Sequence, residues 1–202
     1  MNVCILTHIF PARSETFIRE HAVGMRRRGH QVSVIARTRD PIVSNAEVSE
    51  LDAMGIQRFY VGDLASPKLN RIRAWLVEIR FPHLPKLATN VSSDRRRRWL
   101  VAAAECSAIR SVSPDVVHVH FGDHANHLLR MTNEVFDLPP CVVTWHGYDV
   151  NAIPRRDGER VYDSLFASSA THTCGSNFIV RRLLALGAQQ ERIHRIPMGI
   201  GL

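Results

Sequence analysis

Five side chains that can exchange protons or hold metal ions lie within ten residues, in the segment HVHFGDHANH from His118 to His127. Two histidines separated by one residue on a β-strand place both imidazoles on one face of the sheet, and such a pair can hold zinc or iron. A metal site would also need ligands from neighbouring strands, and the motifs H-E-x-x-H, H-x-x-E-H and D-x-D are absent. Histidines held at a sheet edge and a polar pocket for a hydroxylated ligand are the alternatives. We expect the pocket, lined by His120, Gly122 and His124, without a bound metal.

A second histidine loop follows an apolar run in the segment VVTWHGYDVN. Residues 141–145 predict a central strand, and His146 and Gly147 come directly after it. Glycine allows the backbone and the imidazole to approach a ligand closely, and a neutral imidazole can accept a proton from a sugar hydroxyl or donate to a phosphate. Asp149 could orient this histidine or bind a hydroxyl group itself. A purely structural role for the tetrapeptide HGYD is the alternative.

A third candidate loop, residues 7–16, follows the first expected strand. Ser14, Glu15 and Thr16 would open the next helix, where free backbone N–H groups point toward an incoming anion. Glu15 and Thr16 are therefore binding candidates. The chain lacks G-x-G-x-x-G, G-x-x-x-x-G-K-[ST] and G-x-S-x-G, which argues against a dinucleotide-binding domain, a P-loop enzyme and a serine hydrolase.

Apolar runs alternate with helical periodicity along the chain, which predicts βαβ units and an α/β fold with a doubly wound, mainly parallel sheet. Strands are expected at residues 3–6, 31–36, 56–61, 115–120, 141–145, 170–174 and 192–196. Helices are expected at residues 14–28, 46–54, 69–80, 95–111, 126–135, 156–166 and 178–186, with Ser14 and Ser176 as N-caps. Ligands of open α/β sheets bind beyond the carboxyl ends of the strands, so the three loops should meet at one edge.

The composition is that of a globular protein, with 45% hydrophobic residues and a formal net charge of +7. The four cysteines are far apart, as expected for core residues in a reducing cytosol. Arginine clusters at 26–28 and 95–98 could attract anionic lipid, nucleic acid or phosphorylated substrates. Because no helix-turn-helix, RRM or zinc-finger pattern is present, we expect no nucleic-acid partner.

Four segments, in this order and spacing, resemble the GT-B glycosyltransferases of family 4 that build bacterial exopolysaccharide and lipopolysaccharide. They are FPARSETFIREHAVGMRRRGHQVSVIA, PDVVHVHFG, VVTWHGYDVN and CGSNFIVRRLLALGAQQERIHRIPMGIG. The similarity looks closest to the colanic-acid and amylovoran type and covers nearly the full chain. It implies a Rossmann-like, acceptor-binding N-terminal domain over residues 1–196, with residues 197–202 as the start of an interdomain linker.

The resemblance also implies roles for individual residues. The histidine that matches His146 is expected to be catalytic, to line the cleft between two domains and to contact the transferred sugar. Gly147 and Asp149 lie beside it, and the loop that matches residues 11–16 faces the donor phosphates, with S-E-T where many relatives have a glycine-rich turn. The absent D-x-D motif agrees with metal-independent transfer without a cofactor.

The expected partners are a nucleotide-sugar donor, a lipid-linked or oligosaccharide acceptor, and an anionic membrane surface. The basic residues between Lys68 and Arg98 would suit a lipid diphosphate at the cytoplasmic face of the plasma membrane. The nucleotide-sugar-binding domain is expected beyond residue 202, so the chain alone should be inactive. A non-catalytic sugar- or lipid-binding module and a metal-dependent hydrolase that uses His118 and His120 are the alternatives.

Overall fold

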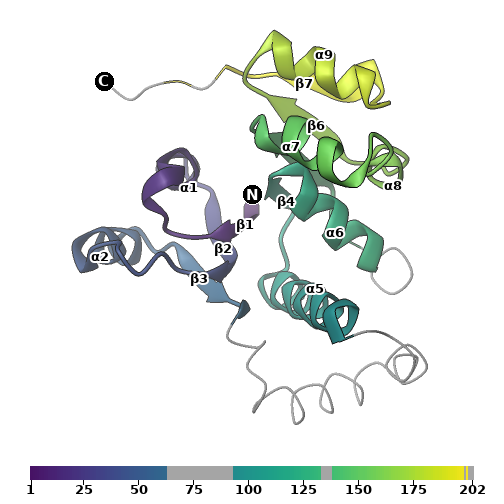
Figure 1. The fold of residues 1–202 in the computed structure, drawn as a ribbon. Helices are drawn as coiled ribbons and strands as arrows, with labels where there is room; N and C mark the ends of the chain where they lie inside the picture. The colour runs from purple at the N-terminus through teal and green to yellow at the C-terminus, as the bar shows by residue number, and fades with distance from the viewer. Residues whose placement is uncertain (63–92, 133–137, 198, 200–202) are drawn as a thin grey trace.

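Seven parallel strands form one sheet in the computed structural model, which describes residues 1–62, 93–132, 138–197 and 199 (Figure 1). The strand order is β3-β2-β1-β4-β5-β6-β7. The strands are β1 (Asn2–Ile9), β2 (Gln31–Thr38), β3 (Gln57–Tyr60), β4 (Val116–His120), β5 (Cys141–Trp145), β6 (Thr171–Cys174) and β7 (Ile193–Arg195). The expected doubly wound α/β fold is thereby confirmed.

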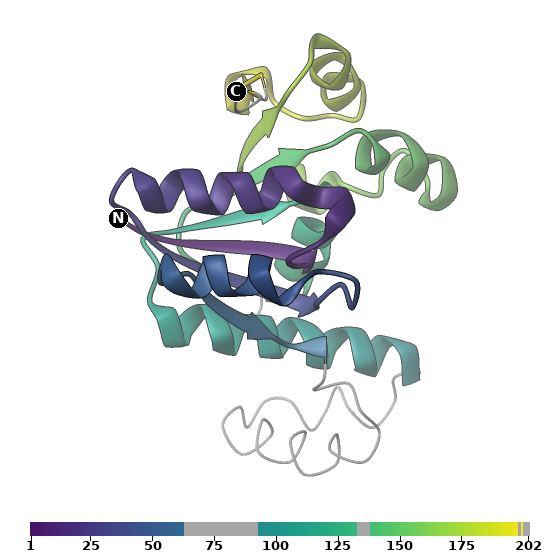
Figure 2. The ribbon, with the colours of Figure 1, turned by 90° about the vertical axis from the view of Figure 1, so that its left-hand side faces the viewer.

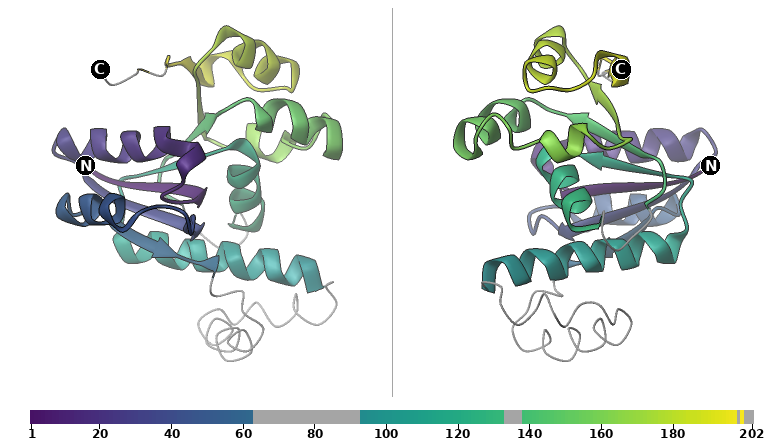
Figure 3. Two further views of the ribbon diagram at one scale, coloured as in Figure 1. Left: turned by 60° about the vertical axis from the view of Figure 1, so that its left-hand side comes forward. Right: turned by 90° about the vertical axis from the view of Figure 1, so that its right-hand side faces the viewer.

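Helices cover the sheet from both sides. On one face lie α1 (Thr16–Arg27) and α2 (Asn45–Ala53), and on the other lie α5 (Ser93–Val112), α6 (Gly122–Thr132), α7 (Tyr148–Asp157), α8 (Asp163–Phe166) and α9 (Asn177–Ala185) (Figures 1 and 2). Two single-turn 3-10 helices are η1 (Arg13–Glu15) and η3 (Gln190–Arg192). Figure 3 shows α5 running alongside β2 and β3, on the face opposite α1. Among the described residues, no helix has the length and apolar character needed to cross a lipid bilayer.

Strand β1 is buried on both of its faces, as expected for a central strand of a parallel sheet. Cys4 and Leu6 belong to the core under α5 and α6, whereas Val3 and Ile5 belong to the core under α1 and α2. The strand order reverses between β1 and β4, because β2 and β3 extend the sheet in one direction and β5 to β7 extend it in the other. Such a reversal opens the crevice in which α/β proteins bind their ligands.

Two predicted N-caps had different outcomes. Ser176 caps α9 as expected, since its Oγ accepts a hydrogen bond from the backbone N–H of Ile179 at 3.3 Å. Ser14 does not cap α1. It lies within η1, and α1 begins at Thr16 after Glu15, with no side-chain hydrogen bond to the helix end.

Several helix boundaries also differ from the prediction. Helix α6 begins at Gly122, four residues before the expected start. The helix expected at 156–166 was wrong: α7 occupies Tyr148–Asp157, with Pro154 inside it, and only the short α8 follows. A proline within helical periodicity usually marks a helix start or break, so the sequence placed the helix after Pro154. The helix expected at 69–80 lies outside the described residues.

A buried hydrogen bond joins β5 to β6 within the larger core. The indole of Trp145 packs edge-on against Tyr162, and its Nε1–H donates to Nδ1 of His172 at 3.3 Å. Trp145 and His172 are each only 1% exposed. Burial, with a contribution from Arg192, lowers the pKa of His172 to about 4. The imidazole is therefore neutral at pH 7 and serves as the acceptor of this bond.

We predict that His172 makes the fold acid-sensitive. Its folded pKa of about 4 lies below its ordinary value of 6.5, so the unfolded chain binds more protons between these values and stability falls as the pH drops through that window. Each such group lowers the free energy of unfolding by about 1 kcal/mol per pH unit. Denaturant unfolding at about pH 7.5 and about pH 5 measures this loss.

The matched variant for this measurement is His172→Gln, whose amide oxygen can accept from the Trp145 indole but does not titrate. It should be about as stable as the wild type near pH 7.5 and lose less stability near pH 5. Equal acid sensitivity in both proteins would show that His172 is not the responsible group.

Candidate active site

Three histidines from three elements form a hydrogen-bonded chain at the carboxyl edge of the sheet. Nδ1 of His21, on α1, lies 3.3 Å from Nε2 of His120 at the end of β4. Nδ1 of His120 lies 3.0 Å from Nε2 of His146, the residue after β5. The chain runs from α1 to the ends of β4 and β5, beside the reversal of strand order between β1 and β4. The structure thus brings together His120 and His146, two of the residues proposed from the sequence.

The H-x-H pair on β4 lies on one face of the sheet, as its spacing predicted, and that face is the one under α1. The rings of His118 and His120 are stacked with centroids 4.9 Å apart and planes 6° apart. Nε2 of His118 lies 2.6 Å from Oγ1 of Thr144, which lies 2.6 Å from Oγ1 of Thr173. A polar row therefore runs across β4, β5 and β6 on this face and fixes the orientation of His118.

Burial keeps these imidazoles neutral. It lowers the pKa of His118 to about 3, that of His146 to about 4, and that of His120 well below the ordinary value of 6.5. It also lowers the pKa of His21. A neutral imidazole carries one N–H donor and one acceptor nitrogen. The chain of three therefore has two possible polarities, with all its protons directed toward His146 or all directed toward His21.

Two aromatic rings hold His146 in place. The centroid of Phe17, on α1, lies 4.6 Å from that of His146, and the centroid of Phe121 lies 4.7 Å away. His146 is half-buried, whereas His120 is only 3% exposed. His146 is consequently the member of the pair better placed to meet a ligand.

Asp149 binds the backbone of both histidine loops. Its carboxylate accepts hydrogen bonds from the N–H groups of Gly122 (2.9 Å), His146 (3.1 Å), Gly147 (2.9 Å) and Val150 (3.1 Å). Burial raises its pKa, and these backbone donors oppose that shift. Of its two expected roles, orienting His146 agrees with these contacts, because its oxygens are occupied by backbone donors and the residue is fully buried.

The two glycines of these loops are required by different constraints. A Cβ on Gly122 would lie 1.9 Å from Cζ3 of Trp145, so only glycine lets this loop pass the buried indole. Gly147 has φ +105°, which side chains rarely adopt, and a Cβ there would meet nothing within 4 Å. Glycine therefore prevents a clash at position 122 and permits an unusual backbone conformation at position 147.

Glu15 and Thr16 lie at the start of α1, next to Phe17. Glu15 is half-buried and accepts a hydrogen bond from Oγ1 of Thr7 at 3.5 Å, and burial raises its pKa. Thr16 is exposed. Because Phe17 contacts His146, this loop borders the histidine chain without hydrogen bonding to it in the described contacts.

His124 lies apart from the histidine chain, on α6 at the opposite face of the sheet. Its Nε2 lies 2.9 Å from Oε1 of Glu105, which also accepts from Nε of Arg37 at 3.3 Å. Its ring stacks on His8 with centroids 4.4 Å apart, and it is 1% exposed. Burial alone would raise the pKa of Glu105, but His124 and Arg37 hold it below its ordinary value. His124 was proposed as a pocket residue; in the structure it lies on α6 as a buried partner of Glu105.

Three residues of this site were not predicted from the sequence: Phe17, His21 and Thr144. Phe17 and His21 are four residues apart, which places them on the same face of a helix. That spacing, facing a strand that ends in polar residues, was the available signal. Thr144 looked like an ordinary residue of an apolar strand.

The comparisons with known proteins identify the family. Residues 14–202 match the family described as Glycosyltransferase Family 4. The chain therefore belongs to glycosyltransferase family 4. A sequence comparison with curated proteins gives no significant match.

Solved structures with a similar fold include a galactosyltransferase. The chain resembles the lipopolysaccharide outer core galactosyltransferase WaaB (TM-score 0.64, 10% identity, covering 99% of this chain and 46% of that one). It also resembles HepE of Anabaena in complex with UDP (TM-score 0.59, 14% identity, covering 99% of this chain and 44% of that one). A third similar structure is sucrose-phosphate synthase of Thermosynechococcus elongatus (TM-score 0.61, 11% identity, covering 99% of this chain and 48% of that one). At these identities the likeness establishes the GT-B Rossmann-like fold. The chain spans under half the length of each of these structures.

We predict that Asp149→Asn loosens the two histidine loops. Asparagine keeps one acceptor oxygen but turns an N–H₂ group toward backbone donors, which should lower the free energy of unfolding by about 1–3 kcal/mol. Denaturant unfolding measures the loss. Asp163→Asn, which removes the charge of an exposed partner of Arg160, is the matched control and should change stability by less than about 0.5 kcal/mol. Equal effects would contradict the assigned role of Asp149.

Proposed function

We propose that the chain provides the acceptor-side domain of an enzyme that transfers a sugar from a nucleotide-sugar donor to a lipid-linked or polysaccharide acceptor. The observation that carries this proposal is the His120–His146 hydrogen bond at the carboxyl ends of β4 and β5, beside the strand-order reversal, in a family 4 chain. It presents a half-buried, neutral imidazole where ligands of this fold class bind. The UDP complex of HepE supports a nucleotide-sugar donor.

His146 is the proposed catalytic-cleft residue. Its pKa of about 4 leaves it neutral at physiological pH, where it can accept the proton of an acceptor hydroxyl or donate a hydrogen bond to the transferred sugar. Its Nε2 is held by His120, so Nδ1 is the nitrogen left to face a substrate. Asp149 and Gly147 position the loop, and Glu15 and Thr16 line the neighbouring edge.

The donor's diphosphate requires further groups. Sugar transfer needs electrostatic stabilisation of the leaving nucleotide diphosphate as well as positioning of both substrates. We propose that a second domain, beyond residue 202, supplies these groups, that residues 197–202 lead into it, and that transfer proceeds without a metal cofactor. That the resembling structures are more than twice as long as this chain supports a two-domain arrangement.

The proposed setting is exopolysaccharide or lipopolysaccharide synthesis at the cytoplasmic face of the plasma membrane. The likeness to the galactosyltransferase WaaB supports the pathway class. The net charge of +7 supports contact with anionic lipid or with an acceptor carried on a lipid diphosphate. The colanic-acid or amylovoran type remains part of this proposal.

We predict that His146→Gln in the whole enzyme lowers kcat/KM by at least about 100-fold, because a general base contributes 10²- to 10⁴-fold. The assay follows transfer of labelled sugar from a panel of nucleotide sugars to a membrane lipid extract, and circular dichroism checks the fold. The control is His194→Gln, an exposed histidine on β7, which should leave transfer unchanged. Full transfer by a folded His146 variant would remove His146 from the mechanism.

A separate prediction concerns the chain of residues 1–202 expressed by itself. It should fold but transfer no sugar above background in the same assay, because the proposed second domain supplies the diphosphate contacts. The whole enzyme, assayed in parallel, is the positive control. Turnover by residues 1–202 alone would overturn the two-domain proposal.

A further inference from the structure

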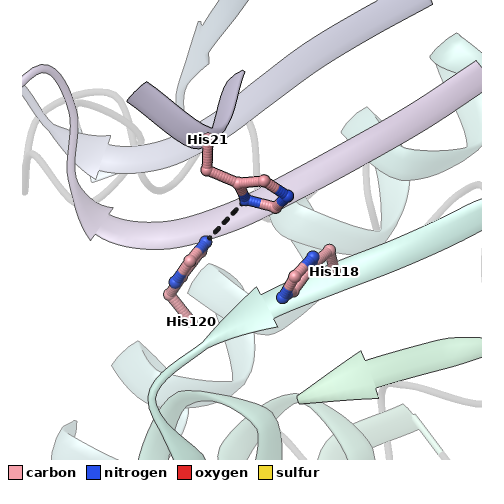
Figure 4. Close-up of side chains that lie close together, drawn as sticks. All are labelled: His21, His118 and His120. Carbon is pink, nitrogen blue, oxygen red and sulfur yellow. Dashed lines mark hydrogen bonds between the residues drawn. The ribbon is translucent and has the colours of Figure 1, made fainter. Parts of the chain in front are cut away.

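Three imidazoles converge from opposite sides of the space between α1 and β4. Figure 4 shows His21 reaching down from α1 toward His118 and His120, which rise from the strand. One nitrogen from each ring can be chosen so that all three lie within 4.8 Å of one another. The His21–His120 pair alone is 99 residues apart in the sequence, so the fold, and no local motif, creates this group.

On two of the three rings, one nitrogen already has a partner outside the group. Nδ1 of His120 bonds to His146 at 3.0 Å, and Nε2 of His118 bonds to Thr144 at 2.6 Å. This leaves Nε2 of His120 and Nδ1 of His118 for a shared ligand. Metal-binding histidines are typically oriented in this way, by a hydrogen bond from the second ring nitrogen.

The spacing suits a tetrahedral ion. With Zn–N bonds of about 2.0–2.1 Å, two nitrogens of a tetrahedral site lie about 3.3 Å apart. Nδ1 of His21 and Nε2 of His120 are separated by 3.3 Å. One nitrogen from each ring lies within 4.8 Å of the others, and because the His118 and His120 rings are stacked with planes 6° apart, the His118 ring must rotate for its nitrogen to point at the same ion.

We propose that His21, His118 and His120 form a binding site for a divalent transition-metal ion of the zinc class. Imidazole ligands favour Zn²⁺, Cu²⁺ and Ni²⁺, whereas Mg²⁺ and Ca²⁺ require oxygen ligands. A neutral imidazole keeps one N–H and offers its other nitrogen to an ion. Three protein ligands leave the fourth position of a tetrahedron for water. The ion is given no step in the proposed sugar transfer, but the site shares His120 with the hydrogen bond to His146.

Isothermal titration calorimetry of the tag-free, chelator-stripped protein with ZnCl₂ tests the site. We expect one Zn²⁺ per chain and no binding of MgCl₂. Co²⁺ in place of Zn²⁺ should give the intense visible absorption of a tetrahedral site. Zn²⁺ should also raise the melting temperature, as any ligand specific to the folded state does.

Variants separate this site from adventitious binding. His21→Gln should weaken Zn²⁺ binding by at least about 100-fold, more than the 10- to 100-fold typical of outer partners. Thr144→Val, which removes the hydroxyl partner of His118 and of Thr173, should weaken it by about tenfold. The control His194→Ala alters an exposed histidine on β7 and should leave the affinity unchanged.

Three results would contradict the proposed metal site. Absence of stoichiometric Zn²⁺ binding by the wild type overturns it, as does binding that survives His21→Gln or is lost with His194→Ala. If His21→Gln does not fold, the decision passes to Thr144→Val and to the wild-type Co²⁺ spectrum. An unchanged affinity in Thr144→Val together with an octahedral Co²⁺ spectrum would then overturn it.

Discussion

The fully buried carboxylate of Asp149 is the constraint on which the site depends. It accepts hydrogen bonds from the backbone of the loop after β4, through Gly122, and of the loop after β5, through His146 and Gly147. A buried carboxylate without partners would be strongly destabilising, so the four donors are required for the fold as well as for the site. Because the donors belong to both loops, the positions of His120 and His146 are coupled through the backbone.

A second constraint is that the face of β4 to β6 under α1 carries polar side chains, which need hydrogen-bond partners within the sheet. His118, Thr144 and Thr173 satisfy one another across three neighbouring strands, and His120 does so between His21 and His146. Since buried polar groups need partners, each of these residues restricts the rotamer of the next. The result is a preorganised row of neutral donors and acceptors across β4, β5 and β6, next to the reversal between β1 and β4.

The sequence predicted the parts of this arrangement that depend on local pattern. The apolar run at 141–145 marked β5 at the bounds that the structure shows, and with it the positions of His146 and Gly147. It could not predict the start of α7, because that helix lacks a Ser or Thr N-cap and begins after a glycine at φ +105°. It also missed His21, whose partner His120 comes from a distant strand. Register and helix docking, which no single segment encodes, create that contact.

The polarity of the histidine chain links the two proposed roles of this region. When the protons point toward His21, Nε2–H of His146 donates to His120 and its Nδ1 is free to accept a proton from a hydroxyl group. A metal ion on Nε2 of His120 excludes this state, because that nitrogen would then carry no proton. His120 must then donate from Nδ1 to His146, whose own Nδ1 becomes a donor. An ion at His21, His118 and His120 would therefore convert His146 from a proton acceptor into a hydrogen-bond donor without touching it.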